Sequence, residues 1–163
     1  MSFEIERKFL VIGDAWRLAV SEQLQLRQAY LDADRRASIR VRITGSREAT
    51  LTIKSRGAEL RRLELEYAIP VLEAEAMIPM RRGSVIEKVR HHVPMGGLTW
   101  EVDVFSGENA GLVIAEVEMS HENQQVELPA WVGAEVTSQS EYYNGSLAQR
   151  PFCTWEVRRA QAG

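Results

Sequence analysis

Apolar and charged side chains alternate one by one along seven segments of this chain. In the segment 38–44, for example, Arg40 and Arg42 each lie between two β-branched residues. Successive side chains of a β-strand point to opposite faces, so this alternation predicts strands with one apolar and one charged face. Glycine-containing turns between the segments favour antiparallel hairpins, and the chain is expected to be mainly β. The predicted strands cover 3–11, 38–44, 50–56, 62–69, 85–92, 99–105 and 113–119.

The charged faces are sorted by sign, because each predicted strand carries two like charges two residues apart. Like charges about 4 Å apart repel by roughly 4 kcal/mol at an effective dielectric constant of 20. A solvated face explains charges on any one strand, but seven such pairs favour faces that converge on something charged, as they would if the sheet curled so that these faces lined its interior. The pairs are Glu4/Glu6, Arg40/Arg42, Lys54/Arg56, Glu64/Glu66, Lys88/Arg90, Glu101/Asp103 and Glu116/Glu118.

An interior lined by both signs is suited to a complex of a metal ion with a polyphosphate. Carboxylates are hard oxygen ligands that Mg²⁺ and Mn²⁺ prefer. Arginine and lysine side chains bind phosphate oxygens. The sequence has neither a Walker loop nor a dinucleotide-binding glycine fingerprint, so phosphate is not expected to bind in either of those ways.

Composition excludes several other classes of protein. The 163 residues are expected to form one domain, 1–163, with a flexible tail after about residue 155. A net charge of −3 argues against binding to duplex nucleic acid, and a single cysteine excludes an intramolecular disulfide. The sequence shows neither a signal peptide nor an apolar run of about 20 residues, so a cytoplasmic protein that does not span the membrane is expected.

Helical signals are few and short. They predict helices over 15–20, 71–78 and 107–111, and a helical or irregular stretch over 137–150. We therefore expect a mainly β (α+β) fold with a few peripheral helices.

The ordered series of charged motifs resembles the CYTH superfamily, also called triphosphate tunnel metalloenzymes. The opening Glu4-Ile5-Glu6-Arg7-Lys8 is similar to the ExExK signature of that family. The further motifs cover nearly the whole chain, and residues 17–36 match least. They are Arg40-x-Arg42, Lys54-x-Arg56, Arg62-x-Glu64-x-Glu66, Lys88-x-Arg90, Glu101-x-Asp103, Glu116-x-Glu118 and Tyr142-Tyr143-Asn144.

This resemblance implies a closed eight-stranded antiparallel β tunnel that binds a linear triphosphate with Mg²⁺ or Mn²⁺. By position, the implied metal ligands are Glu4, Glu6, Glu116 and Glu118, with Glu64, Glu66, Glu101 and Asp103 completing or positioning a second ion. The implied phosphate-binding residues are Lys8, Arg40, Arg42, Lys54, Arg56, Lys88 and Arg90. Tyr30 resembles a tyrosine that assists proton transfer beside the lysine of the signature; a packing role is equally compatible with the sequence.

The resemblance implies a metal-dependent triphosphatase that releases phosphate and a diphosphate. Two alternatives stay open, an adenylate cyclase of class IV type and a non-catalytic module that binds phosphate compounds. The apolar strand faces must point out of such a tunnel, and few helices are available to cover them, so we expect a homodimer.

Overall fold

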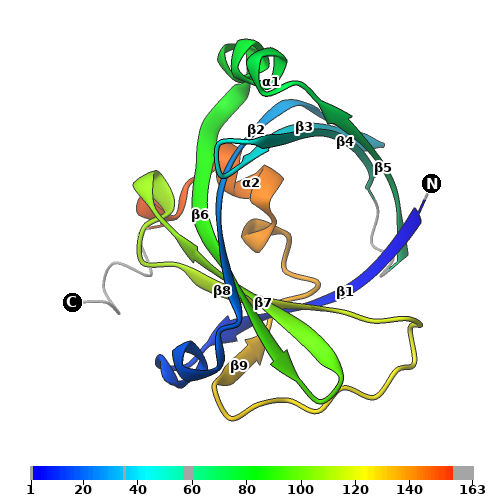
Figure 1. Cartoon of the computed structure of the whole chain (residues 1–163), viewed down its shortest axis with the longest axis vertical. Helices are drawn as coiled ribbons and strands as arrows, with labels where there is room; N and C mark the ends of the chain where they lie inside the picture. Colours follow the sequence, from blue (N-terminus) through cyan, green and yellow to red (C-terminus); the bar gives the residue numbers. More distant parts are fainter. Residues whose placement is uncertain (1, 35, 57–60, 156–163) are drawn as a thin grey trace.

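The computed structural model describes residues 2–34, 36–56 and 61–155, which are built around one large β-sheet (Figure 1). The predicted flexible tail lies outside the described residues. The strands are β1 (Ser2–Val11), β2 (Glu22–Ala33), β3 (Ala37–Thr44), β4 (Glu48–Ser55), β5 (Arg61–Ile69), β6 (Arg82–Met95), β7 (Leu98–Phe105), β8 (Val113–Glu118) and β9 (Val132–Glu135). The helices are α1 (Val71–Met77) and α2 (Asn144–Gln149), with 3-10 turns η1 (Ala15–Ala19), η2 (Ile78–Met80), η3 (Gly107–Asn109), η4 (Ser140–Tyr142) and η5 (Phe152–Thr154).

The sheet closes into a ring, which confirms the predicted eight-stranded antiparallel barrel. The strand order around the ring is β5-β4-β3-β2-β6-β7-β8-β1, and β1 pairs again with β5 (Figure 1). The first half of β1 pairs with β5, and its second half pairs on the same edge with the short β9. β9 is therefore an additional strand beside the barrel, and the alternation of charges did not predict it.

At several positions opposite charges lie side by side on neighbouring strands, which offsets part of the repulsion within each strand, whereas Glu6 lies opposite Glu118 and Glu101 opposite Glu116. The strand register places Lys8 opposite Glu116 and Arg90 opposite Asp103. Lys54 lies opposite Glu64 in the same way. Cross-strand pairs of opposite sign offset the repulsion along each strand.

The barrel interior changes from charged to apolar towards one end. Ile86, Phe105 and Ile114 lie two residues from Lys88, Asp103 and Glu116 and therefore share their inward face. The C-terminal segment packs onto them, with Tyr142, Leu147, Ala148 and Trp155 in the same buried cluster. The segment that carries α2 thus fills this end of the barrel against β6 and β2.

Two apolar clusters cover the outside of the barrel. One joins Phe9, Val93 and Trp100 beneath Trp16 of η1, and the other joins Val41 and Ile43 beneath α1. Burying such side chains stabilises the fold by about 1.5–3 kcal/mol each. None of the helices in the described ranges is long and apolar enough to span a membrane.

The predicted elements agree with the structure except where local signals are weak. The predicted helix 71–78 is α1, whereas the predicted helices 15–20 and 107–111 are short 3-10 turns. The largest difference is β2, which the alternation rule did not predict. Its inward residues include Leu26, Gln28 and Tyr30, which carry no charge, so β2 lacks the pattern of the other strands.

Candidate functional site

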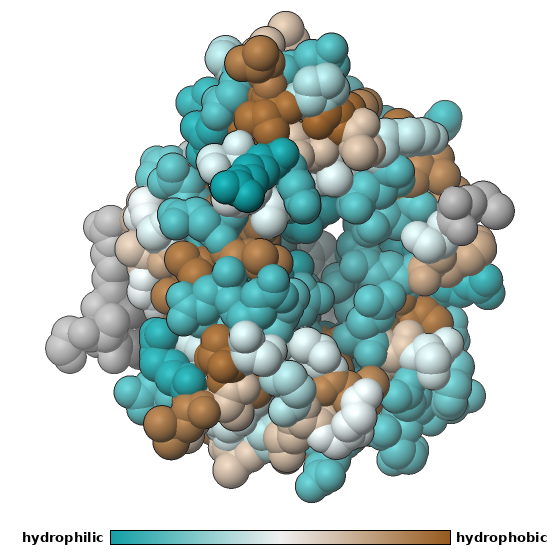
Figure 2. All heavy atoms as spheres, viewed as in Figure 1, coloured by the Kyte–Doolittle hydropathy of each residue, from teal (hydrophilic) through white to brown (hydrophobic). Residues whose placement is uncertain are grey.

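The barrel encloses a cavity with about 930 Å³ of space free of protein atoms, part of it open to solvent. Figure 2 shows a hollow surrounded by hydrophilic side chains. All eight barrel strands, β1 to β8, contribute side chains to its lining, together with the segment that begins α2. The charged lining residues are Glu4, Glu6, Lys8, Arg40, Arg42, Lys54, Arg56, Arg62, Glu64, Glu66, Arg90, Glu101 and Glu116, and the uncharged ones include Tyr30, Ser38, Thr52, Ser55, Tyr143 and Asn144.

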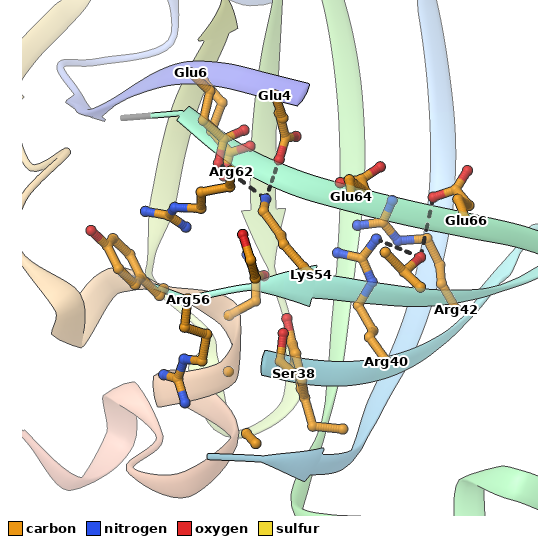
Figure 3. Close-up of a pocket in the computed structure, with 18 of the residues that line it drawn as sticks. Glu4, Glu6, Ser38, Arg40, Arg42, Lys54, Arg56, Arg62, Glu64 and Glu66 are labelled. Atoms are coloured by element: carbon orange, nitrogen blue, oxygen red, sulfur yellow. Dashed lines mark hydrogen bonds and ion pairs between the residues drawn. The ribbon is translucent and has the colours of Figure 1, made fainter. Parts of the chain in front are cut away.

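Most of the predicted site residues therefore line this one cavity, and three do not. Lys88 and Asp103 are fully buried behind the lining. Glu118 is exposed and lies opposite Glu6 on the neighbouring strand. The labelled side chains of the neighbouring strands β3, β4 and β5 lie side by side on the cavity wall, and Lys54 points towards Glu4 of β1 (Figure 3).

Lys54 lies between the two acidic residues of β1. Its Nζ atom forms an ion pair with Glu4 and lies 3.7 Å from Glu6 Oε1 (Figure 3). Lys8 forms a comparable contact, with its Nζ atom 3.1 Å from Glu116 Oε1. Cations of the cavity thus lie beside the carboxylates of Glu4, Glu6 and Glu116.

Asp103 is the most strongly held carboxylate. Lys88 Nζ donates to its Oδ2 atom at 2.6 Å, and Arg90 donates to both of its oxygens at 2.8 Å. Burial raises the pKa of Asp103, but Arg90 and Lys88 outweigh this effect and lower it. Burial in turn lowers the pKa of Lys88 to about 8. This cluster supports the cavity wall from behind and leaves Asp103 few free lone pairs for a metal ion.

Arg40 and Arg42 concentrate positive charge on β3. Arg40 Nη2 donates to Thr52 Oγ1 at 3.3 Å, and Thr52 donates to Glu66 at 3.1 Å. Arg42 Nε donates to Gln28 Oε1 at 2.9 Å. Burial and the neighbouring Arg40 and Arg90 lower the pKa of Arg42 to about 9. Such a cluster of guanidinium groups favours an anion in the cavity.

Negative charge is concentrated on β1 and β8. Burial and the nearby Glu116 raise the pKa of Glu6 to about 7. Burial, Glu101 and Glu6 also raise the pKa of Glu118. By contrast, burial of Glu116 is outweighed by Lys8 and Arg90, which hold its pKa well below the usual range. A cation bound near Glu6 would thus reduce the repulsion between this carboxylate and its acidic neighbours.

Sequence reasoning assigned no role to several lining residues. Arg62 shares the inward face of Glu64 and Glu66, so period-2 alternation was sufficient to find it. The Tyr143 ring lies between two cations, 5.2 Å from Lys8 Nζ and 4.8 Å from Arg62 Cζ. Its hydroxyl donates to the Thr137 carbonyl at 2.6 Å. Tyr143 comes from irregular backbone, where no periodic signal exists.

The cavity can hold an anion and a cation together. Its described lining has seven basic side chains against six carboxylates. Across the ranges 2–34, 36–56 and 61–155, no three acidic, histidine or cysteine side chains already converge on one point as a metal site. The donors are nevertheless oxygens, which suit Mg²⁺ or Mn²⁺ and not a soft metal.

Comparisons with known proteins agree with this geometry. Residues 2–152 match the CYTH domain family. The chain is 42% identical to an inorganic triphosphatase of Acetivibrio thermocellus over 93% of its own length and 97% of the relative's. It is 40% identical to an inorganic triphosphatase of Nitrosomonas europaea, over 89% and 96% of the two chains. A crystal structure of an inorganic triphosphatase superposes with a TM-score of 0.65 at 35% identity, covering 91% of this chain and 95% of the other.

Proposed function

The chain belongs to the CYTH domain family, and from this we propose that it is an inorganic triphosphatase. The reaction would add water across a terminal phosphoanhydride bond and release phosphate and pyrophosphate. The observation that carries the proposal is the closed barrel whose cavity is lined by basic pairs and carboxylates together. Phosphoryl transfer requires mainly positioning and charge neutralisation, and both are properties of such a cavity.

The proposal includes Mg²⁺ or Mn²⁺ as the cofactor. The residues that would hold it are Glu4, Glu6, Glu116 and Glu118, with Glu64, Glu66 and Glu101 near a second ion. The raised pKa of Glu6 supports a cation there, because burial beside other carboxylates penalises its charge. The chemistry that such an ion supplies when bound is neutralisation of phosphate oxygens and acidification of a water molecule.

The protein's own cations would hold and orient the substrate. Arg40 and Arg42 present planar guanidinium groups that match pairs of phosphate oxygens. Lys54, Arg56 and Arg90 line the same cavity and would bind further oxygens. We assign Lys8 and Tyr30 to proton transfer, since both line the cavity and are buried.

Phosphate release from inorganic triphosphate, pyrophosphate and ATP, measured side by side with Mg²⁺, tests the proposal. Triphosphate is expected to be the best substrate, because pyrophosphate has fewer oxygens to span the basic pairs. A parallel assay for cyclic AMP tests the cyclase alternative. The double variant Arg40→Ala with Arg42→Ala is the control for contaminating phosphatases. Binding without turnover, or cyclic AMP as the main product, would contradict the proposal.

We also infer a homodimer in the cytoplasm. The outward side chains Phe3 and Tyr67, on the paired strands β1 and β5, are about half exposed. Aromatic side chains exposed on one face are typical of an interface. Analytical ultracentrifugation is expected to give twice the mass of one chain. A monomer at micromolar concentration would contradict the dimer.

A further inference from the structure

Arg42 carries a half-buried guanidinium group on the cavity wall, and its direct partner is uncharged. Within the described ranges, no carboxylate lies within ion-pair distance of it, and its single hydrogen bond runs from Nε to Gln28 Oε1 at 2.9 Å. Arg90, by comparison, is paired with Asp103 and Glu101. Buried charges are normally paired with an opposite charge because their desolvation is costly. Arg42 therefore lies beside the cavity without a directly paired carboxylate in the described ranges.

Gln28 is placed to orient this guanidinium group. It lies directly opposite Arg42 in the pairing of β2 with β3, and its side chain is completely buried. Its Nε2 group has no hydrogen-bond partner in the part of the chain that the structure describes. A buried amide donor without a partner destabilises the fold. The one side-chain hydrogen bond of Gln28, which its Oε1 atom accepts from Arg42, is therefore the polar contact that accounts for a glutamine at this buried position.

The Nη atoms of the Arg42 guanidinium group are available to bind a ligand. Gln28 holds the Nε atom, and neither Nη atom forms a hydrogen bond with another residue in the described ranges. Arg42 lines the cavity, so its Nη atoms are free to bind a ligand there. A carboxylate at position 28 would make the same hydrogen bond but would cancel the charge. A neutral acceptor fixes the direction of the guanidinium fork and keeps its charge for an anion.

We propose that Gln28 is a positioning residue for substrate binding, which holds the Arg42 fork towards the phosphate oxygens without neutralising it. The proposal rests on the proposed triphosphatase function. Gln28 does not line the cavity and is not expected to contact the substrate.

Two substitutions separate positioning from packing. Gln28→Leu removes the acceptor at similar volume, and we expect KM for triphosphate to rise about tenfold, comparable to losing one well-oriented hydrogen bond to a charged group. Gln28→Glu keeps an acceptor but pairs the charge, so KM is expected to rise at least as much while Tm stays equal or increases. Gln23→Leu and Gln23→Glu, at an exposed position of the same strand, are the matched controls.

A second readout does not depend on activity. The Nε–H signal of Arg42 in ¹⁵N NMR spectra is expected to be protected from exchange in the wild type and to lose protection in Gln28→Leu. In an Arg42→Ala background, Gln28→Leu is expected to have no further effect on KM. Unchanged KM in Gln28→Glu, retained protection in Gln28→Leu, or equal effects in both backgrounds would each overturn the proposal. If the wild type does not hydrolyse triphosphate, the proposed function fails, and the NMR comparison still decides whether Gln28 holds Arg42.

Discussion

Phosphate release from inorganic triphosphate is expected to stop when divalent cations are removed with EDTA, and to return when Mg²⁺ or Mn²⁺ is added in excess. A linear triphosphate carries about four negative charges near neutral pH. The described lining has only one more basic side chain than carboxylates. Without a cation, the substrate would therefore face six carboxylates in a poorly solvated cavity. We expect a loss of roughly a thousandfold or more in kcat, measured by colorimetric detection of phosphate.

The control for this experiment is Ca²⁺ added in place of Mg²⁺ after chelation. Ca²⁺ takes more ligands at longer distances and is expected to restore binding without full turnover. Thermal unfolding in EDTA is run in parallel, because a collapse of the fold would also stop hydrolysis. Full activity in excess chelator, with a folded protein, would contradict the metal assignment.

The alternation of charges was sufficient to predict seven strands with one charged face each, because the charges follow the period of a strand, whereas the closed eight-stranded barrel was implied by the resemblance to the CYTH superfamily. Arg40 and Arg42, or Glu64 and Glu66, identify an inward face wherever the alternation is strict. β2 lacks this signal because its inward residues Leu26 and Gln28 are uncharged and its outward face includes Arg27. The strand that carries Gln28 was consequently the one that pattern reasoning did not find.

The position of each charge within the barrel depends on contacts between distant segments. Lys88 and Arg90 share one inward face, yet only Arg90 lines the cavity. Lys88 is covered because Asn144, from the start of α2, accepts a hydrogen bond from its Nζ atom at 3.1 Å. No property of the strand itself predicts that the C-terminal segment fills this end of the barrel.

The substitutions Glu6→Gln and Glu118→Gln are expected to lower activity and to raise the stability of the metal-free protein. Each removes a proposed metal ligand, and we expect kcat/KM to fall roughly a hundredfold or more at limiting Mg²⁺. Both carboxyl groups have a raised pKa, so the folded protein disfavours their ionised forms. Phosphate release and chemical denaturation, measured on the same preparations, give the two effects. Glu108→Gln, at an exposed site outside the cavity lining, is the matched control.

The pH dependence of stability separates this explanation from a simple change of surface charge. The pKa of Glu6 is raised from 4.5 to about 7 in the folded protein. Between these two pH values Glu6 is ionised in the unfolded chain but protonated in the folded protein, so a rise in pH through this range favours the unfolded chain. The wild type therefore loses stability between about pH 4.5 and 7, and Glu6→Gln does not. The stability difference is expected to be near zero below pH 4 and to reach about 3 kcal/mol at most above pH 7. Excess Mg²⁺ should stabilise the wild type more than the variant and so reduce or reverse this difference. A stability difference that is independent of pH and Mg²⁺, together with wild-type turnover in both variants, would mean that these carboxylates are merely solvated side chains and do not bind a metal ion.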